Sequence, residues 1–196
     1  MLHEENSEAD PPGPIASWEW FNGWLDTLTE YGEPAQWVLA LGSYGYDWTE
    51  GEKEAETIRF QDVMSRAGRS SSVSCDFAAP AFNPHFGYED SGATHTVWFL
   101  DAVTFLNQLK TGRAHHAGGV AISRLGTEDP GIWQILMLDT AKPFIRDNLA
   151  ILETIRPGGA IANIGRGNFI TMADERADGT RRVMLDKNGA PQDPVT

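Results

Sequence analysis

The chain has 196 residues, with 28 acidic and 15 basic side chains that give a net charge of −13. Hydrophobic residues make up 41% of the sequence, which excludes wholesale disorder, and no apolar run approaches the roughly 18 residues of a membrane span. Cys75 stands alone, so the sequence cannot build an internal disulfide framework or a cysteine-rich zinc site.

The acidic residues are concentrated in the first 54 positions, which hold twelve acidic side chains and one basic one, Lys53. Such a surface repels phosphate backbones, and no stripe of Lys and Arg appears elsewhere, so we expect no nucleic-acid partner. A neutral ligand such as a glycan is compatible with this charge, and solubility alone also explains it. The first five residues are acidic rather than apolar, so no signal peptide is expected there.

The first predicted element is a helix that follows a proline-rich loop at residues 7–14. Ser17 is a candidate N-cap, and Gly32 with Pro34 would end the helix. Apolar side chains recur at three- and four-residue steps and define one face: Ile15, Trp18, Phe21, Leu25 and Leu28.

A short apolar run at residues 37–42 lies between breaker residues, as is typical of a strand buried in a parallel sheet. The aromatic and polar residues 43–48 are expected to form a loop at the C-terminal end of this strand. Residues 54–67 predict a second helix, because four apolar side chains fall on one side of it: Phe60, Val63, Met64 and Ala67.

A β-rich insertion is predicted at residues 71–98. Its first strand shows alternation at Val73, Cys75 and Phe77, and further strands are expected at residues 85–88 and 94–100.

The elements after the insertion continue the earlier pattern. Asp101 begins a predicted helix that runs to Arg113, and residues 118–126 form a second apolar run bounded by glycines. Residues 127–130 can start a further short helix, with Pro130 at its first position. This alternation of helices and strands is typical of a β/α layer fold.

The last part of the chain has a different pattern. We expect a helix at residues 142–155, a break at Pro157, and a small β appendage from residues 160–172 and 181–185, followed by a flexible tail.

The sequence contains no pattern that favours a metal or cofactor. His115 and His116 are adjacent, so in a helix their rings point about 100° apart and do not converge on one ion. Gly165 and Gly167 lack the third glycine and the following helix of a dinucleotide site, and no Gly-x-Ser-x-Gly motif occurs. We therefore expect no metal and no cofactor.

The strongest chemical signal is a set of aromatic and charged residues after the two apolar strands. Tyr44, Tyr46, Asp47 and Trp48 follow the first strand, and Arg124, Glu128 and Asp129 follow the second. The C-terminal ends of parallel strands build the active face of a barrel, and sugars stack on aromatic rings while carboxylates and Arg bind their hydroxyls. The first group also fits a packed loop whose rings fill the core, and the second fits a structural ion pair.

Five segments carry a resemblance to a known family. They are Pro-Gly-Pro-Ile-Ala-Ser (12–17), Leu-Gly-Ser-Tyr-Gly-Tyr-Asp-Trp (41–48), Phe-Gly-Tyr-Glu-Asp (86–90), His-Thr-Val-Trp-Phe-Leu-Asp-Ala (95–102) and Arg-Leu-Gly-Thr-Glu-Asp-Pro-Gly-Ile-Trp (124–133). In this order they resemble the C-terminal part of a glycoside hydrolase family 18 (chitinase-like) barrel. The resemblance extends to spore-cortex-type hydrolases and is better to the bacterial barrels that are fused to a polysaccharide deacetylase and a family 2 glycosyltransferase.

The resemblance implies an α/β fold that is a partial (β/α)8 (TIM) barrel. It would contain the last two to three β/α units, with residues 37–44 and 119–125 as the seventh and eighth strands, residues 71–98 as an insertion and residues 101–113 as the seventh helix. An eight-unit barrel needs about 250 residues. We therefore expect a fragment, with residues 1–138 as the C-terminal part of the barrel and residues 139–196 as a connector with a small β appendage.

The resemblance also implies chemistry on β-linked N-acetylglucosamine polysaccharide, chitin-like or peptidoglycan, by a substrate-assisted mechanism. The family's proton donor is the glutamate of an Asp-x-x-Asp-x-Asp-x-Glu motif, which is absent from this sequence, so this chain alone is expected to be inactive and to have no catalytic residue. The residues expected to contact sugar are Glu4, Tyr44, Tyr46, Asp47, Trp48, Arg124 and Glu128.

Three positions depart from the family pattern. His3 and Glu4 stand where the sixth strand has Tyr and Asp, and Ser123 stands where the eighth strand has the Trp that floors the sugar subsite. These departures support an alternative: a non-catalytic carbohydrate-binding or scaffolding segment of a multidomain polysaccharide-synthesising glycosyltransferase.

The expected partner is a polysaccharide or oligosaccharide. The resemblance implies a membrane-anchored bacterial parent protein that acts on the extracytoplasmic face. Because a partial barrel leaves unpaired sheet edges, self-association through these edges is also expected.

Overall fold

The structure is a computed structural model that describes residues 4–69, 75, 81–137, 171–174, 181–185 and 191–192. Its centre is a parallel pair of strands, β1 (Val38–Gly42) and β6 (Gly119–Ser123). The register pairs Val38 with Gly119 and Gly42 with Ser123, so both strands end at the same level. The expectation that these two apolar runs are neighbours in a parallel array is confirmed.

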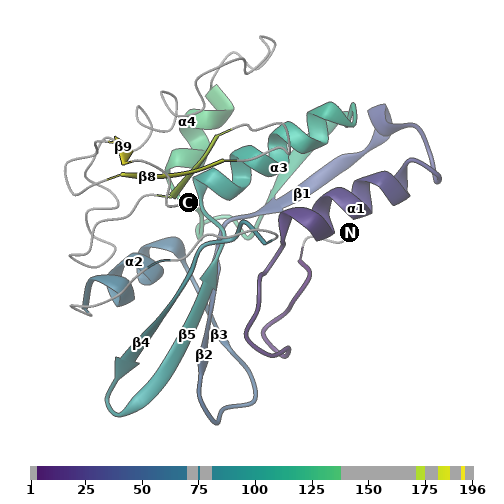
Figure 1. The fold of residues 1–196 in the computed structure, drawn as a ribbon. Helices are drawn as coiled ribbons and strands as arrows, with labels where there is room; N and C mark the ends of the chain where they lie inside the picture. Colours follow the sequence, from purple (N-terminus) through teal and green to yellow (C-terminus); the bar gives the residue numbers. More distant parts are fainter. Residues whose placement is uncertain are drawn as a thin grey trace.

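Three helices pack around this pair. They are α1 (Trp18–Leu28), α3 (Ala102–Ala114) and α4 (Gly131–Met137), and α3 contacts both of the other helices as well as β1. A short 3₁₀ helix, η1 (Pro34–Gln36), leads from α1 into β1 (Figure 1). The main core lies between the helices and the sheets.

The predicted helix starts are confirmed by their caps. The Ser17 hydroxyl accepts from the backbone N–H of Trp20 at 3.2 Å, and the Asp101 carboxylate accepts from the backbone N–H of Thr104 at 2.9 Å. Such caps satisfy N–H groups that have no partner inside the helix. Phe21 and Leu25 form the buried face of α1, whereas Ile15 lies before the helix and belongs to a second core cluster.

An antiparallel sheet of four strands extends away from α1, α3 and α4 (Figure 1). Its order is β3 (Glu56–Ile58), β2 (Gly45–Thr49), β5 (Ala93–Phe99) and β4 (His85–Asp90). The expected strands at 85–88 and 94–100 are confirmed as the β4–β5 hairpin. The expectation of a loop at residues 43–48 is wrong: Gly45–Thr49 is a strand, because β3 and β5 supply its hydrogen-bond partners on both edges.

The helix expected at residues 54–67 begins later. Residues Glu56–Ile58 form β3, and the helix α2 spans Phe60–Arg69. Its predicted apolar face is confirmed, since Phe60, Val63 and Ala67 are buried. Cys75 is buried, but the other residues of the strand expected at 73–77 lie outside the described residues.

A separate antiparallel sheet of three strands lies near the C-terminus. It consists of β7 (Thr171–Asp174), β8 (Arg181–Leu185) and β9 (Pro191–Gln192), and β7 contacts α3. The structure is therefore a mixed α/β fold with one parallel and two antiparallel sheets. The helix expected at 142–155, the break at Pro157 and the rest of the tail lie outside the described residues.

The close packing at Gly45 makes a direct test of this arrangement. A Cβ at Gly45 would lie 2.8 Å from the Val63 side chain and 3.2 Å from the Phe99 Cβ, so α2 and β5 leave room for hydrogen alone. We expect Gly45→Ala to lower the free energy of unfolding by about 1–3 kcal/mol, because overpacking forces neighbours to move. Urea unfolding measures this loss.

Gly119→Ala is the matched control for that variant, because a Cβ at Gly119 meets nothing within 4 Å. Gly119 lies in the parallel pair, so both substitutions put the same methyl group into a strand. Equal stabilities of the two variants would contradict the packing of β2 between α2 and β5.

Candidate functional site

The candidate site lies where β1 and β6 end. Ser43 follows β1 directly, and its backbone C=O accepts from the Thr127 hydroxyl at 3.0 Å. The backbone N–H of Asp129 donates to the Ser43 hydroxyl at 2.9 Å. The parallel register therefore holds the loop at residues 124–129 against the start of β2, and it brings Arg124 of the second predicted group to Tyr44 and Tyr46 of the first.

Glu4 is the centre of this contact. Its Oε2 accepts from the Tyr44 hydroxyl at 2.6 Å and from the Tyr46 hydroxyl at 2.8 Å, and it lies 3.6 Å from an Arg124 nitrogen. Hydrogen bonds to an ionised acceptor are short and stronger than neutral ones. The carboxylate thus joins residues that are 40 or more positions apart in the sequence.

Arg124 closes the site from the β6 side. Its guanidinium donates to the Tyr46 hydroxyl at 2.9 Å and to the Thr57 hydroxyl at 3.3 Å, and its central carbon lies 4.3 Å from the centroid of the Tyr44 ring. A cation over an aromatic face contributes about 0.5–2 kcal/mol. The backbone φ of Arg124 is +59°, a left-handed conformation that costs about 1–3 kcal/mol in a non-glycine residue. The contacts of the side chain and the anchored loop hold this conformation.

The aromatic rings of Tyr44, Tyr46 and Trp48 are buried in the described structure. Tyr44 and Tyr46 have no exposed surface and Trp48 is 7% exposed. The N-terminal segment covers them, since the Trp48 indole N–H donates to the Asp10 backbone C=O at 2.7 Å and the Ala55 backbone N–H donates to that of Glu8 at 2.7 Å. The rings therefore fill a small core, and their faces are not open to a sugar.

Asp47 lies on the opposite face of β2, because successive strand residues point to opposite sides. Its side chain is 1% exposed and accepts from the Tyr88 hydroxyl at 2.6 Å, from His95 Nδ1 at 3.0 Å and from the Arg66 guanidinium. Arg66 also pairs with Glu56 at 2.8 Å. The structure thus separates Asp47 from the Glu4 cluster and places it in a buried network that ties α2 to the antiparallel sheet.

Glu128 lies on the far side of the loop at 124–129. One carboxylate oxygen accepts from the Gly126 backbone N–H at 2.5 Å and the other from the Trp133 indole N–H at 3.2 Å. Partial burial raises the pKa of Glu128, but the backbone and Trp133 donors outweigh burial and lower the pKa. Glu128 is therefore an acceptor rather than a proton donor near neutral pH.

Two residues of this region were not predicted from the sequence. The pKa of the Glu8 carboxyl is lowered, first by its own backbone N–H and also by the Tyr46 hydroxyl and the Arg124 charge, so Glu8 faces the same cluster as Glu4. Trp133 adjoins Glu128 and is 44% exposed. The dense acidic start of the sequence was a signal for Glu8, and the motif at 124–133 already contained Trp133.

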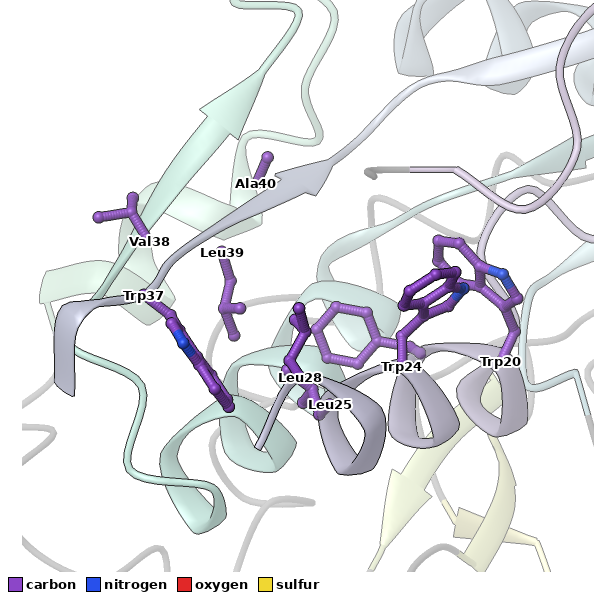
Figure 2. A pocket seen from close by; sticks show the side chains of 9 residues that line it. Trp20, Trp24, Leu25, Leu28, Trp37, Val38, Leu39 and Ala40 are labelled. Carbon is purple, nitrogen blue, oxygen red and sulfur yellow. The ribbon is translucent and has the colours of Figure 1, made fainter. Parts of the chain in front are cut away.

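A separate apolar cavity of about 340 Å³ lies between α1 and β1 (Figure 2). Trp20, Trp24 and Leu28 of α1 face Trp37 and Leu39 across it. None of the described residues that line it is charged, so they offer few partners for sugar hydroxyls. Among the described residues, no group of three or more His, Cys, Asp or Glu side chains could hold a metal ion, and no helix is long and apolar enough to cross a membrane.

In comparison with known proteins, the chain is similar to proteins named as a glycosylase, a cortex-lytic enzyme and a chitinase. No protein-family model matches the chain. An uncharacterized glycosylase, YvbX of Bacillus subtilis (strain 168), is 25% identical over 146 residues, which cover 71% of this chain and 41% of that protein.

Solved structures give the same result. The spore cortex-lytic enzyme SleL of Bacillus megaterium is 26% identical with a TM-score of 0.61, over 66% of this chain and 31% of that one. A chitinase of Chromobacterium violaceum is 26% identical with a TM-score of 0.66, over 73% of this chain and 45% of that one. The chain therefore spans less than half the length of each of these proteins. The mixed α/β fold resembles chitinase-like neighbours, as the sequence motifs predicted.

The buried tyrosines predict how stability depends on alkaline pH. Burial and then the Glu4 hydrogen bond raise the pKa of Tyr44 and Tyr46, and burial and then the Asp47 hydrogen bond raise that of Tyr88. An unfolded tyrosine loses its proton near pH 10. Above that pH the unfolded chain binds fewer protons than the folded chain, so the free energy of unfolding falls as pH rises.

Tyrosinate absorbance and circular dichroism, followed together in a Tyr31→Phe background, measure this effect. Tyr31 is 78% exposed, so its removal leaves the signal of the three buried tyrosines. We expect their ionisation to coincide with the loss of helical signal. Ionisation of these tyrosines in a still-folded chain would contradict the hydrogen bonding described for Glu4 and Asp47.

Proposed function

We propose that this chain forms part of a glycoside hydrolase family 18-like domain that binds or acts on β-linked N-acetylglucosamine polysaccharide. The observation that carries the proposal is the edge at the ends of β1 and β6, where Glu4, Arg124 and Glu128 lie near the ends of two parallel strands. The relatives named as a glycosylase, a cortex-lytic enzyme and a chitinase support the same class of ligand. Partly exposed carboxylates and a guanidinium can bind sugar hydroxyls and acetamido groups.

The residues have different roles in this proposal. Arg124 and Glu128 keep part of their surface open and contact the sugar directly, and Glu4 adds an acceptor beside Arg124. Tyr44 and Tyr46 are buried, and their hydroxyls position Glu4 and Arg124. Trp48 supports them by packing, since the centroid of its ring lies 5.6 Å from the centroid of the Tyr46 ring. Asp47 stabilises the antiparallel sheet.

The chemical step itself needs a group outside this set. Glu4 is held between two tyrosine hydroxyls and an arginine, so its Oε2 is already engaged as an acceptor within the chain. In the proposal, the substrate-assisted reaction of the whole domain draws its proton from the family's glutamate, which this sequence lacks.

The fold part of the proposal is a partial (β/α)8 barrel. Val38 is 58% exposed although it lies in a central strand, and the cavity between α1 and β1 opens beside it (Figure 2). Among the described residues, β6 is the one strand that pairs with β1. An open strand edge with an apolar face favours association, so we expect self-association that increases with concentration in sedimentation velocity. A monomer at all concentrations would contradict this part.

The alternative is a non-catalytic sugar-binding or scaffolding segment of a multidomain polysaccharide-synthesising glycosyltransferase. The hydrogen bonds of Glu4 within the chain and the buried rings of Tyr44, Tyr46 and Trp48 favour this role, because these groups support a site rather than react in it. Both forms of the proposal require that the chain bind the sugar.

Isothermal titration of the whole chain with a hexamer of N-acetylglucosamine tests binding. We expect Arg124→Ala to weaken the affinity about tenfold, because a hydrogen bond to a charged group contributes about 1.5 kcal/mol or more. Arg59→Ala is the control, since Arg59 pairs with Asp62 on the exposed surface. We also expect the chain alone to release no shorter sugars.

Two results would contradict the proposal. If the unaltered chain does not bind the hexamer, the proposed sugar ligand is wrong. If Arg124→Ala and Arg59→Ala bind the hexamer with equal affinity, the ends of β1 and β6 are not the binding site. Hydrolysis of the hexamer by the chain alone would contradict the expectation that the chain lacks the general acid.

A further inference from the structure

We propose that Trp133 is the aromatic platform on which a sugar ring stacks at this site. The inference rests on the proposed function and adds a binding residue to those expected from the sequence. Sugar rings have apolar faces that pack on aromatic side chains, so a sugar site requires an exposed ring beside hydrogen-bonding groups. The rings of Tyr44, Tyr46 and Trp48 are closed to a ligand, because none is more than 7% exposed.

Trp133 meets both requirements. It is 44% exposed, and its indole N–H donates to Glu128 Oε1 at 3.2 Å. That bond orients the ring, and the exposed part of the residue is available to a ligand. A carboxylate oxygen accepts more than one hydrogen bond, so Glu128 can also accept from a sugar hydroxyl next to the stacked ring.

The loop at residues 124–129, which carries Glu128 and leads into α4 with Trp133, is held before any ligand arrives. The Phe60 backbone N–H donates to the Thr127 C=O at 2.9 Å, and the Gln61 side chain donates to the Glu128 C=O at 3.2 Å. Asp129 accepts from the backbone N–H groups of Ala102 and Gly131, both at 2.9 Å. Contacts from α2, α3 and α4 therefore fix the loop, and a preorganised site loses little entropy on binding.

The same loop connects Trp133 to the Glu4 cluster. Arg124 begins it and contacts Tyr46, and Glu128 ends it and contacts Trp133. Gly126, at φ +92°, allows the sharp turn between them and donates its backbone N–H to Glu128. A sugar chain that reaches from Arg124 to Trp133 would thus meet a cation, a carboxylate and an aromatic face in succession.

Titration of the whole chain with the N-acetylglucosamine hexamer tests the platform with two substitutions. We expect Trp133→Ala to weaken the affinity about five- to tenfold and Trp133→Phe to change it less, because phenylalanine keeps a ring. Trp24→Ala is the matched control, because Trp24 is 38% exposed but lies in the apolar cavity beside β1. We expect the Trp24→Ala variant to bind the hexamer with unchanged affinity.

Oxidation of exposed tryptophans by N-bromosuccinimide, read by peptide mass spectrometry, tests the same point without a substitution. We expect the hexamer to slow the oxidation of Trp133 at least severalfold and to leave that of Trp24 unchanged.

The outcomes separate this inference from the proposed function. Suppose that Arg124→Ala weakens binding, that Trp133→Ala does not, and that the hexamer does not protect Trp133 from oxidation. The stacking role of Trp133 is then wrong, and the proposed function stands. If the unaltered chain binds no hexamer, both are overturned. If Trp133→Ala fails to fold, the oxidation result decides alone.

Discussion

The parallel register of β1 and β6 is the constraint on which the candidate site depends. Because Gly42 is paired with Ser123, the residues after both strands meet at one level, and Ser43 bonds to Thr127 and Asp129 of the opposite loop. The apolar content of the two strands supplies the driving force for their burial. The charged groups of the site come together as a consequence of this pairing, although they are far apart in the sequence.

The strands and helices that carry a strong local pattern could be predicted from the sequence. The apolar runs at 37–42 and 118–126 are strands, and the caps at Ser17 and Asp101 start helices, because local side-chain chemistry decides these features. The strand β2 could not be predicted in the same way. Tyr46, Asp47 and Trp48 alternate as a strand requires, but β3 lies in the segment for which the apolar spacing predicted a helix, and β5 lies far along the chain. Gly45 and Asp47 are also poor strand formers.

The strand at residues 45–49, where a loop was predicted, determines which of the predicted site residues lie together. A loop would allow Asp47 to join Tyr44 and Tyr46, whereas a strand places Asp47 on the opposite face, where Arg66, His95 and Tyr88 satisfy it. The position of Glu4 against both tyrosines depends on the path of the N-terminal segment, which no local pattern encodes. The exposure of Trp133 is likewise a property of the folded loop, and so it could not be found from spacing.

The site combines rigid and open parts. Tyr44, Tyr46, Glu4 and one face of Arg124 form a hydrogen-bonded support, while Glu128 and Trp133 form the more accessible rim. This division is typical of ligand sites, in which buried groups orient the residues that touch the ligand. It is compatible with both forms of the proposed function.

Nuclear magnetic resonance of the whole chain tests the central constraint most directly. The account predicts through-space contacts between residues 38–42 and 119–123 in parallel order, together with upfield shifts of the Arg124 side-chain protons, because its guanidinium carbon lies 4.3 Å from the centroid of the Tyr44 ring. Absence of contacts between the two strands, or Arg124 shifts equal to those of an unfolded chain, would contradict it.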